Sequence, residues 1–248
     1  MLPSTFLLTE NNKLTPFIHE LKLRGDCSAI TNPGQFVQVE VPGKFLRRPF
    51  SVCDVTGDVL TLCVRRQGEG TETLCGLPVG TELNLLTGLG NGFDLSVASP
   101  RPLLIGGGSG VGALYALAKE LMNRGRMVHA ALCFATAADV YYEAQFRALG
   151  AEVTVFTEDG SAGEQGNALF ALMLPHWDIF ACGPLGMLAA LDDAAEADLQ
   201  MSLEARMGCG FGACMGCTIE TEDGPKRVCR DGPVFQGQTI RWSEPDDD

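Results

Sequence analysis

The chain has 248 residues, of which 46% are hydrophobic, 20% charged and 7% aromatic, and its formal net charge is −13. At about 100–200 residues per domain, this length accommodates one large domain or two to three small ones. The acidic balance argues against a protein whose main partner is a nucleic-acid backbone, because such binding needs a basic surface. Residues 1–66 do not share this acidic balance, because they contain 8 Lys and Arg against 6 Asp and Glu.

No segment predicts export or membrane insertion. The first basic residue is Lys13, after Glu10, so no basic region leads into an apolar signal core. The longest uncharged run, Pro102 to Ala118, is about the minimum length of a membrane span, but it contains five glycines. We therefore expect a cytoplasmic protein with free thiols and neither membrane nor nucleic acid as a partner.

Residues 1–94 are typical of short strands separated by turns. Apolar and polar residues alternate, and Gly or Pro interrupts the pattern at 33–34, 42–43, 57–58 and 78–80. This pattern predicts an antiparallel barrel or sandwich. The candidate strands are 35–41, 51–55, 59–64 and 81–86.

Beyond residue 101 the pattern changes. Apolar strand candidates begin near Pro102, Met127, Glu152 and Asp178, with helix-like stretches such as Val111 to Met122 between them. Strands and helices alternating at this spacing predict a parallel sheet. From about Met201 the chain is rich in Gly and Cys, then hairpin-like over 217–229 with a turn at 223–224, and we expect the acidic end, 244–248, to be a solvated tail.

Four of the ten cysteines fall within 21 residues: Cys209, Cys214, Cys217 and Cys229. The first three have the Cys-x4-Cys-x2-Cys spacing of plant-type 2Fe–2S sites, with the fourth more distant. Small residues fill most of the loop, so backbone N–H groups can approach sulfur. A four-thiolate zinc site is the alternative, although zinc more often uses two separated Cys-x2-Cys pairs. Disulfides are disfavoured without an export signal.

Two glycine-containing turns follow predicted parallel strands. Residues 103–113 run from an apolar strand through Gly106, Gly107, Gly108 and Gly110 into a helix, a geometry that presents backbone N–H groups to a pyrophosphate. A tight packing turn is the alternative. A second turn, 181–186, ends the last predicted strand, and ligands bind where such strand ends meet.

A basic segment opens a strand in the least acidic part of the chain. Arg48 offers a bidentate partner for a phosphate, Ser51 a hydroxyl for a ring, and Phe50 a flat apolar face. Arg65 and the turn 68–71 follow about twenty residues later. Alone, this segment also fits a solvated basic strand end.

The order of these motifs resembles the ferredoxin–NADP reductase superfamily. The matching residues are Arg48-Pro49-Phe50-Ser51, then Gly70-Thr71, then 106–111, then Cys182-Gly183-Pro184. With the four cysteines after the nucleotide-binding part, residues 40–240 resemble the electron-transfer subunits of class 1B, NAD-dependent dihydroorotate dehydrogenases. The short loop before Cys229 and Ser109 inside the glycine turn depart from the family pattern, and neither removes a ligand.

The resemblance implies three domains: an FAD-binding β-barrel over 1–98, a parallel-sheet NAD-binding α/β domain over 99–200 and a small 2Fe–2S domain over 201–248. It assigns FAD to Arg48, Pro49, Phe50, Ser51, Cys63, Val64, Arg65, Gly70 and Thr71, with phosphate bound by the Gly70-Thr71 backbone and the Thr71 hydroxyl. It assigns NAD to Gly107, Gly108, Ser109, Gly110, Val111, Gly183 and Pro184, with Cys182 as a positioning group near the hydride path. The cluster ligands would be Cys209, Cys214, Cys217 and Cys229.

NAD is favoured over NADP, because residues 135–143 contain no basic residue and two acids. The resemblance further implies a partner, an FMN-bearing dihydroorotate dehydrogenase catalytic subunit in a heterotetramer. Electrons would pass from this partner through the cluster and FAD to NAD+, in pyrimidine biosynthesis. The alternatives are an NAD(P)H–ferredoxin reductase or hydrogenase-type diaphorase subunit with the same modules, and a zinc-stabilised nucleotide-binding regulator without enzymatic activity.

Overall fold

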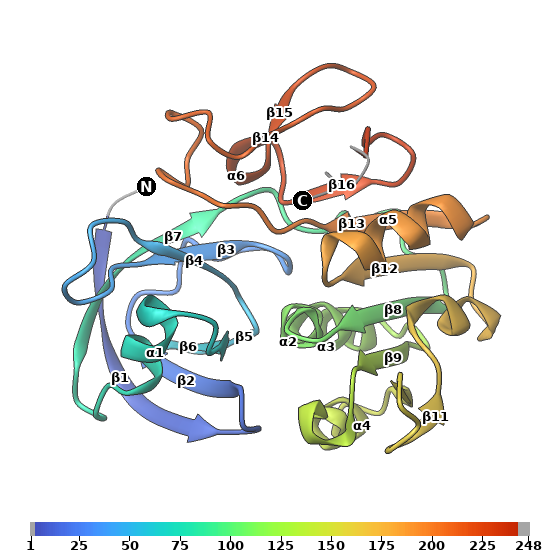
Figure 1. Cartoon of the computed structure of the whole chain (residues 1–248), viewed down its shortest axis with the longest axis horizontal. Helices are drawn as coiled ribbons and strands as arrows, with labels where there is room; N and C mark the ends of the chain where they lie inside the picture. The colour runs from blue at the N-terminus through green and yellow to red at the C-terminus, as the bar shows by residue number, and fades with distance from the viewer. Residues whose placement is uncertain (1–2, 243–248) are drawn as a thin grey trace.

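The computed structural model describes residues 3–242, and the predicted tail at 244–248 lies outside them. Its first half is a seven-stranded antiparallel sheet in the order β4-β3-β7-β1-β2-β6-β5. Because β4 and β5 are consecutive in the chain but lie at opposite edges, the sheet curls into a barrel (Figure 1). The strands are β1 (Pro3–Lys13), β2 (Ile18–Arg24), β3 (Phe36–Val39), β4 (Arg48–Ser51), β5 (Asp54–Thr56), β6 (Val59–Arg65) and β7 (Glu82–Leu89).

Alternate side chains of these strands fill the barrel, as the period of two predicts. The core includes Phe6, Leu8, Leu21, Leu23, Val37, Val39, Leu60, Leu62, Val64 and Leu85. The prediction of one strand over 51–55 is wrong. The N–H of Val52 donates to the Gln35 carbonyl, whereas that of Cys53 donates to the Thr61 carbonyl. The chain therefore changes partner strand between β4 and β5.

The second half is a seven-stranded sheet in the order β11-β10-β9-β8-β12-β13-β16, parallel from β11 to β13. The four predicted strands are confirmed. Because β8 is central and the chain then moves to each side of it, the carboxyl ends of β8 and β12 are adjacent, where ligands bind in such sheets. The strands are β8 (Pro102–Gly107), β9 (His129–Phe134), β10 (Glu152–Thr157), β11 (Glu164–Gln165), β12 (Asp178–Cys182), β13 (Asp198–Ser202) and β16 (Val234–Gln236).

Short helices connect these strands. The predicted helix over 111–122 is instead two helices separated at Leu114, whose N–H donates to the Val111 carbonyl in a tighter turn. The helices are α1 (Glu69–Cys75), α2 (Gly110–Ala113), α3 (Tyr115–Asn123), α4 (Glu143–Ala148), α5 (Leu185–Ala194) and α6 (Val228–Asp231), with 3-10 helices η1 (Ala137–Asp139) and η2 (Ala168–Met173). Within the described residues, no helix is long and apolar enough to span a membrane.

The C-terminal segment, from residue 203 on, lies across both sheets (Figure 1). Its hairpin is β14 (Thr218–Ile219) with β15 (Lys226–Arg227), and the predicted turn is confirmed because Thr221 and Gly224 exchange two backbone hydrogen bonds. After α6, strand β16 pairs antiparallel with β13. The chain thus returns to the second sheet, and β13 itself spans the predicted boundary at 200/201. The three-domain division stays a prediction.

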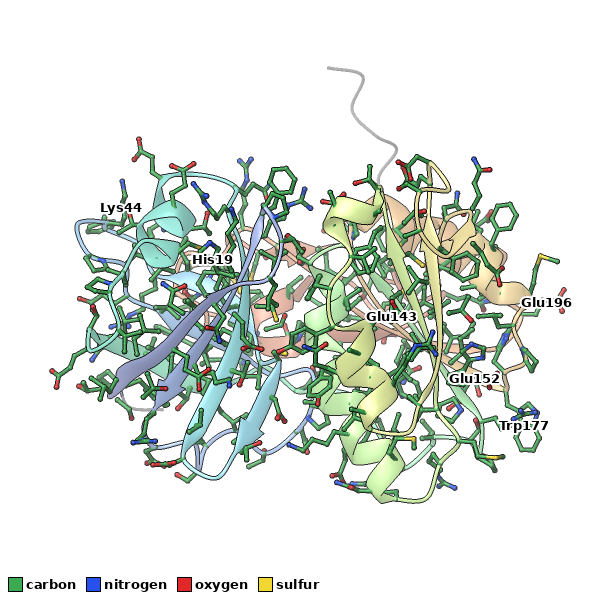
Figure 2. The ribbon with its side chains drawn as sticks, turned by 90° about the horizontal axis from the view of Figure 1, so that it is seen from below. His19, Lys44, Glu143, Glu152, Trp177 and Glu196 are labelled. Atoms are coloured by element: carbon green, nitrogen blue, oxygen red, sulfur yellow. The ribbon has the colours of Figure 1, made fainter. Side chains whose placement is uncertain are left out.

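The barrel and the second sheet lie side by side, with Lys44 on the barrel and Trp177 and Glu196 at the far side of the other half (Figure 2). Polar contacts from Lys119 and Tyr142 are among those that join them. Lys119 on α3 donates to both carboxylate oxygens of Asp54 on β5, each at 2.9 Å. The Tyr142 hydroxyl donates to Glu20 at 2.6 Å.

Candidate functional site

A cavity between the barrel and the second sheet, here called the interface cavity, collects most of the residues predicted to bind FAD. These are Pro49, Phe50 and Ser51 on β4, Cys63 and Arg65 on β6, and Thr71 on α1. Because β4 and β6 meet at the closure of the barrel, residues distant in sequence share one wall. Ser109 and the segment 203–207 form the opposite wall. Val64 does not contribute a side chain, since it is fully buried in the barrel core.

A second depression, the loop cavity, lies at the outer end of the same strands and is lined by Lys44, Arg48 and residues 67–71. Arg48 donates only to the carbonyls of Leu46 and Arg47, and it forms no ion pair within residues 3–242. Its charge is therefore available for an anion. A Cβ on Gly70 would lie 3.0 Å from Arg48 Nε, so glycine lets this side chain cross the loop.

The Thr71 hydroxyl is bonded within its own loop, and its predicted contact with a phosphate stays a prediction. Its hydroxyl accepts hydrogen bonds from the backbone N–H groups of Gln67 and Gly68, at 2.9 and 3.2 Å, and donates to the Gly68 carbonyl. The hydroxyl thus shapes the loop that faces the cavity. Backbone groups and Arg48 are the groups of the loop cavity that could hold an anion.

The third cavity, the glycine-turn cavity, has a volume of about 440 Å³, within the range of small-molecule sites. It is lined by Gly107, Gly108, Ser109 and Pro184 at the carboxyl ends of β8 and β12. Asp139 and Glu158, which follow β9 and β10, also line it. Arg65 is its one basic lining residue, and no other Arg or Lys of the described chain reaches it.

The remaining predicted nucleotide-binding residues are packing residues in this structure. Val111 is fully buried in the core beside α3. A Cβ on Gly110 would lie 2.2 Å from the carbonyl oxygen of Cys182, so this glycine permits close contact between α2 and the end of β12. Gly183 packs in the same way against Met187 and Gly107. Glycine-turn spacing therefore reflects packing at these positions.

Cys182 is 1% exposed at the end of β12 and lines none of the three cavities. Burial raises the pKa of its thiol to about 12, and the nearby Glu204 acts in the same direction. The thiol is therefore protonated at neutral pH, which agrees with a residue that is no nucleophile. Its positioning role stays a prediction.

The four clustered cysteines lie in two pairs, each joined by a backbone hydrogen bond to sulfur. Cys214 donates its N–H to Cys209, and Cys229 donates its N–H to Cys217. The N–H groups of Ala213 and Cys214 point at Cys209 Sγ, at 3.2 and 3.4 Å, and the N–H of Cys229 points at Cys217 Sγ at 3.4 Å. Partial burial opposes ionisation of Cys209, but these donors and that of Phe211 outweigh it and lower the pKa to about 6. The backbone donors thus stabilise thiolate charge at Cys209, whereas burial and the neighbouring Cys217 raise the pKa of Cys229 to about 12.

Comparison with known proteins agrees with this arrangement. Residues 204–241, which contain all four cysteines, match the model of the "iron-sulfur cluster binding domain of dihydroorotate dehydrogenase B". The chain is 43% identical to the dihydroorotate dehydrogenase B (NAD(+)) electron transfer subunit of Geobacillus thermodenitrificans, with 90% of this chain and 92% of the relative covered. It is 36% identical to that of Bacillus pumilus, with 95% and 97% covered.

The chain belongs to the family of dihydroorotate dehydrogenase B (NAD(+)) electron transfer subunits. The predicted resemblance is therefore confirmed. Among solved structures, an NADH-dependent reduced ferredoxin–NADP oxidoreductase superposes with a TM-score of 0.87 at 25% identity, covering 96% of this chain and 90% of that one. This likeness confirms the predicted fold class.

Two residues of the site were not predicted from the sequence. Glu204 lines the interface cavity, where desolvation raises the pKa of its carboxyl and Arg65 opposes the rise. It follows β13 directly, so its place at a strand end was a usable signal. Gln38 lies beneath the cysteine loop, against Gly210, and no local pattern distinguishes it from other strand residues.

Proposed function

We propose that this chain is the electron-transfer subunit of an NAD+-dependent dihydroorotate dehydrogenase that serves pyrimidine (UMP) synthesis. It takes electrons from an FMN-containing catalytic subunit, in a heterotetramer, and delivers them through a 2Fe–2S cluster and FAD to NAD+. One observation carries the proposal. The interface cavity shares Arg65 and Ser109 with the glycine-turn cavity, and its opposite wall is the segment 203–207 that leads to Cys209. The interface cavity thus adjoins both the glycine-turn cavity and the segment that leads to the cysteine loop.

The barrel residues fit FAD. Arg48 in the loop cavity supplies an unneutralised cation for a pyrophosphate, and the loop 67–71 adds backbone groups. Phe50 and Ser51 in the interface cavity supply an apolar face and a hydroxyl for the ring system. The two cavities share Gln67 and Thr71, so one extended dinucleotide can occupy both.

The cysteine pairs fit a cluster better than a single ion. Among residues 3–242, no three Cys, His, Asp or Glu side chains converge as one metal ion would require. A 2Fe–2S cluster takes two thiolates on each iron, which suits the pairs Cys209–Cys214 and Cys217–Cys229. Backbone N–H groups aimed at two of the sulfurs stabilise the negative charge that such a cluster carries.

The glycine-turn cavity fits NAD+ better than NADP+. Gly107 and Gly108 expose backbone to a pyrophosphate, and Asp139 and Glu158 line the side where the adenosine ribose lies in sheets of this kind. Two carboxylates there accept hydrogen bonds from ribose hydroxyls and repel a 2′-phosphate.

Bound FAD exchanges two electrons with a nicotinamide and single electrons with an iron–sulfur cluster. The chain's own residues bind, orient and enclose these groups. Arg65 borders both cavities at the point where nicotinamide and flavin would meet. Phe36, Leu203 and Met207 give the interface cavity part of an apolar lining, and Leu203 and Met207 lie in the segment that leads to Cys209.

The test begins with the purified protein. We expect a visible spectrum with flavin and iron–sulfur bands, stoichiometric FAD, iron and inorganic sulfide, and bleaching by NADH under anaerobic conditions, with NADPH much less effective. A colourless protein that contains zinc and no flavin overturns the proposal and favours the nucleotide-binding regulator.

The partner is tested by co-purification from the source cells. An FMN-containing protein that oxidises dihydroorotate, recovered with this chain in equal amounts at the mass of a heterotetramer, is the expected result. Recovery of hydrogenase or other iron–sulfur subunits in its place contradicts the assignment while leaving the cofactor content intact.

A further inference from the structure

Strand β3 presents one face to the barrel and the other to the C-terminal segment. Val37 and Val39 point into the barrel core, whereas Phe36 belongs to the hydrophobic cluster that also contains Cys217 and Cys229. Gln38 lies on the same side as Phe36, two residues along the strand, and is fully buried. A polar side chain of the flavin-binding barrel is therefore enclosed beneath the cysteine-containing segment.

The Gln38 amide has no hydrogen-bond partner. Neither its Nε2 nor its Oε1 has one within the described protein. Gln35, three residues earlier, is fully engaged: its Oε1 accepts from the N–H groups of Thr31 and Asn32, and its Nε2 donates to the Gly90 carbonyl. Native proteins rarely bury an amide unpaired, because the desolvation goes uncompensated. Such an amide indicates a ligand that completes it.

The amide lies against the cysteine loop. A Cβ on Gly210 would be 2.6 Å from Gln38 Nε2 and 2.9 Å from its Cδ, so the contact exists only because this position is glycine. Gly210 also has a φ of +81°, which favours glycine independently, and it directly follows Cys209. The backbone of Gln38 pairs with Pro49 of β4, the strand predicted to hold FAD. Gln38 therefore contacts the cysteine loop from a strand next to the predicted flavin site.

We propose that the Gln38 side chain is a positioning residue for the iron–sulfur cluster, donating its amide N–H to the sulfur atoms held by the 209–214 loop. This inference rests on the proposed function, because it requires the cluster. Thiolate and sulfide sulfurs accept hydrogen bonds, and donors to them stabilise the more negative, reduced cluster. Gln38 therefore raises the reduction potential of the cluster from the barrel side.

The decisive variant is Gln38→Leu, which keeps the size of the side chain and removes the donor. In the complete complex, an EPR-monitored redox titration is expected to show full cluster content and a lower midpoint potential. One neutral hydrogen bond corresponds to about a fivefold shift in the ratio of reduced to oxidised cluster, or about 40 mV at 59 mV per tenfold. The flavin potential is expected to stay unchanged.

Two further variants control for packing. Gln35→Leu removes three real hydrogen bonds, so it should lower the melting temperature without moving the cluster potential. Gln38→His restores an N–H donor at the same position and should return the potential toward the wild-type value. If Gln38→Leu does not retain the cluster, the cluster content and potential of Gln38→His are compared with those of the wild type. Loss of the cluster in both variants overturns the proposal.

Different results contradict the proposed function and the role of Gln38. A wild-type protein without an iron–sulfur signal contradicts the proposed function itself. If the wild type holds the cluster and the cluster potential is the same in Gln38→Leu, only the role of Gln38 is contradicted.

Discussion

Substitution of Gly110 by alanine tests whether the glycine turn is a packing device between α2 and β12. A Cβ at this position would lie 2.2 Å from the Cys182 carbonyl oxygen, 2.4 Å from its carbonyl carbon and 2.7 Å from Gly183 N. Ordinary contacts to a Cβ begin near 3.4 Å, so more than 1 Å of overlap has to be relieved. All three clashing atoms belong to backbone, so no side-chain rotation relieves the overlap.

Overpacking a well-filled site costs about 1–3 kcal/mol, and a backbone clash belongs at the upper end of that range. At about 2–4 °C per kcal/mol for a chain of this size, Gly110→Ala should lower the melting temperature by about 6–12 °C. Ser109 and Pro184, next to the displaced ends of α2 and β12, line the glycine-turn cavity, so NADH affinity should fall as well. FAD content should remain, because the barrel residues are untouched.

Gly186→Ala is the matched control, since Gly186 borders the same cavity but a Cβ there meets no atom within 4 Å. Gly186 lies in α5, where alanine is favoured over glycine by up to about 1 kcal/mol. The melting temperature of Gly186→Ala should therefore equal or exceed that of the wild type. Differential scanning fluorimetry and NADH titration measure both effects. A Gly110→Ala protein that melts and binds NADH like the wild type would refute the packing argument.

Four other substitutions test separate parts of the molecule. Arg48→Ala should release FAD during gel filtration, because no other arginine lines the loop cavity, and full flavin occupancy would contradict the assignment. Cys214→Ser should lose the iron–sulfur bands and keep FAD, whereas parallel loss of both in metal and flavin analysis would refute their independence. Lys119→Met removes the partly exposed contact with Asp54 and should lower stability by at most about 1 kcal/mol, an effect that disappears in high salt. Burial lowers the pKa of His129 in the folded protein, so below about pH 6.5 the unfolded chain takes up the proton first. His129→Gln should therefore lose less stability than the wild type between pH 7 and pH 5, as measured by urea unfolding. Equal losses in the two proteins would contradict this.

Local patterns predicted most of the architecture. Apolar runs at regular spacing identified β8, β9, β10 and β12, because fully buried parallel strands consist of such runs. Strand β1 was not singled out, since polar residues occupy its second half and its pairing with β2 extends it. The change of partner strand at Val52 was equally invisible, because it depends on hydrogen bonds to residues elsewhere in the chain.

The functional site shows the same contrast between features fixed by local sequence and features that depend on the fold. The cysteine spacing is local, so the loop could be predicted as one unit, and the structure adds the backbone N–H groups that point at two of its sulfurs. A strand-end motif, by contrast, does not indicate which of its residues faces a ligand. Gly108 and Ser109 line the cavity, whereas Gly110 and Val111, in the same motif, are packing residues.

The residues that connect the sites are the hardest to predict from sequence, for a physical reason. Arg65 and Glu204 approach each other across the interface cavity from β6 and from the segment after β13, which are more than 130 residues apart in the chain. Gln38 meets Gly210 across an even longer separation. Electron transfer through this chain requires three sites to adjoin, and adjacency of distant segments is a property of the fold. Side chains at these junctions are therefore where substitutions should alter redox coupling while each cofactor stays bound.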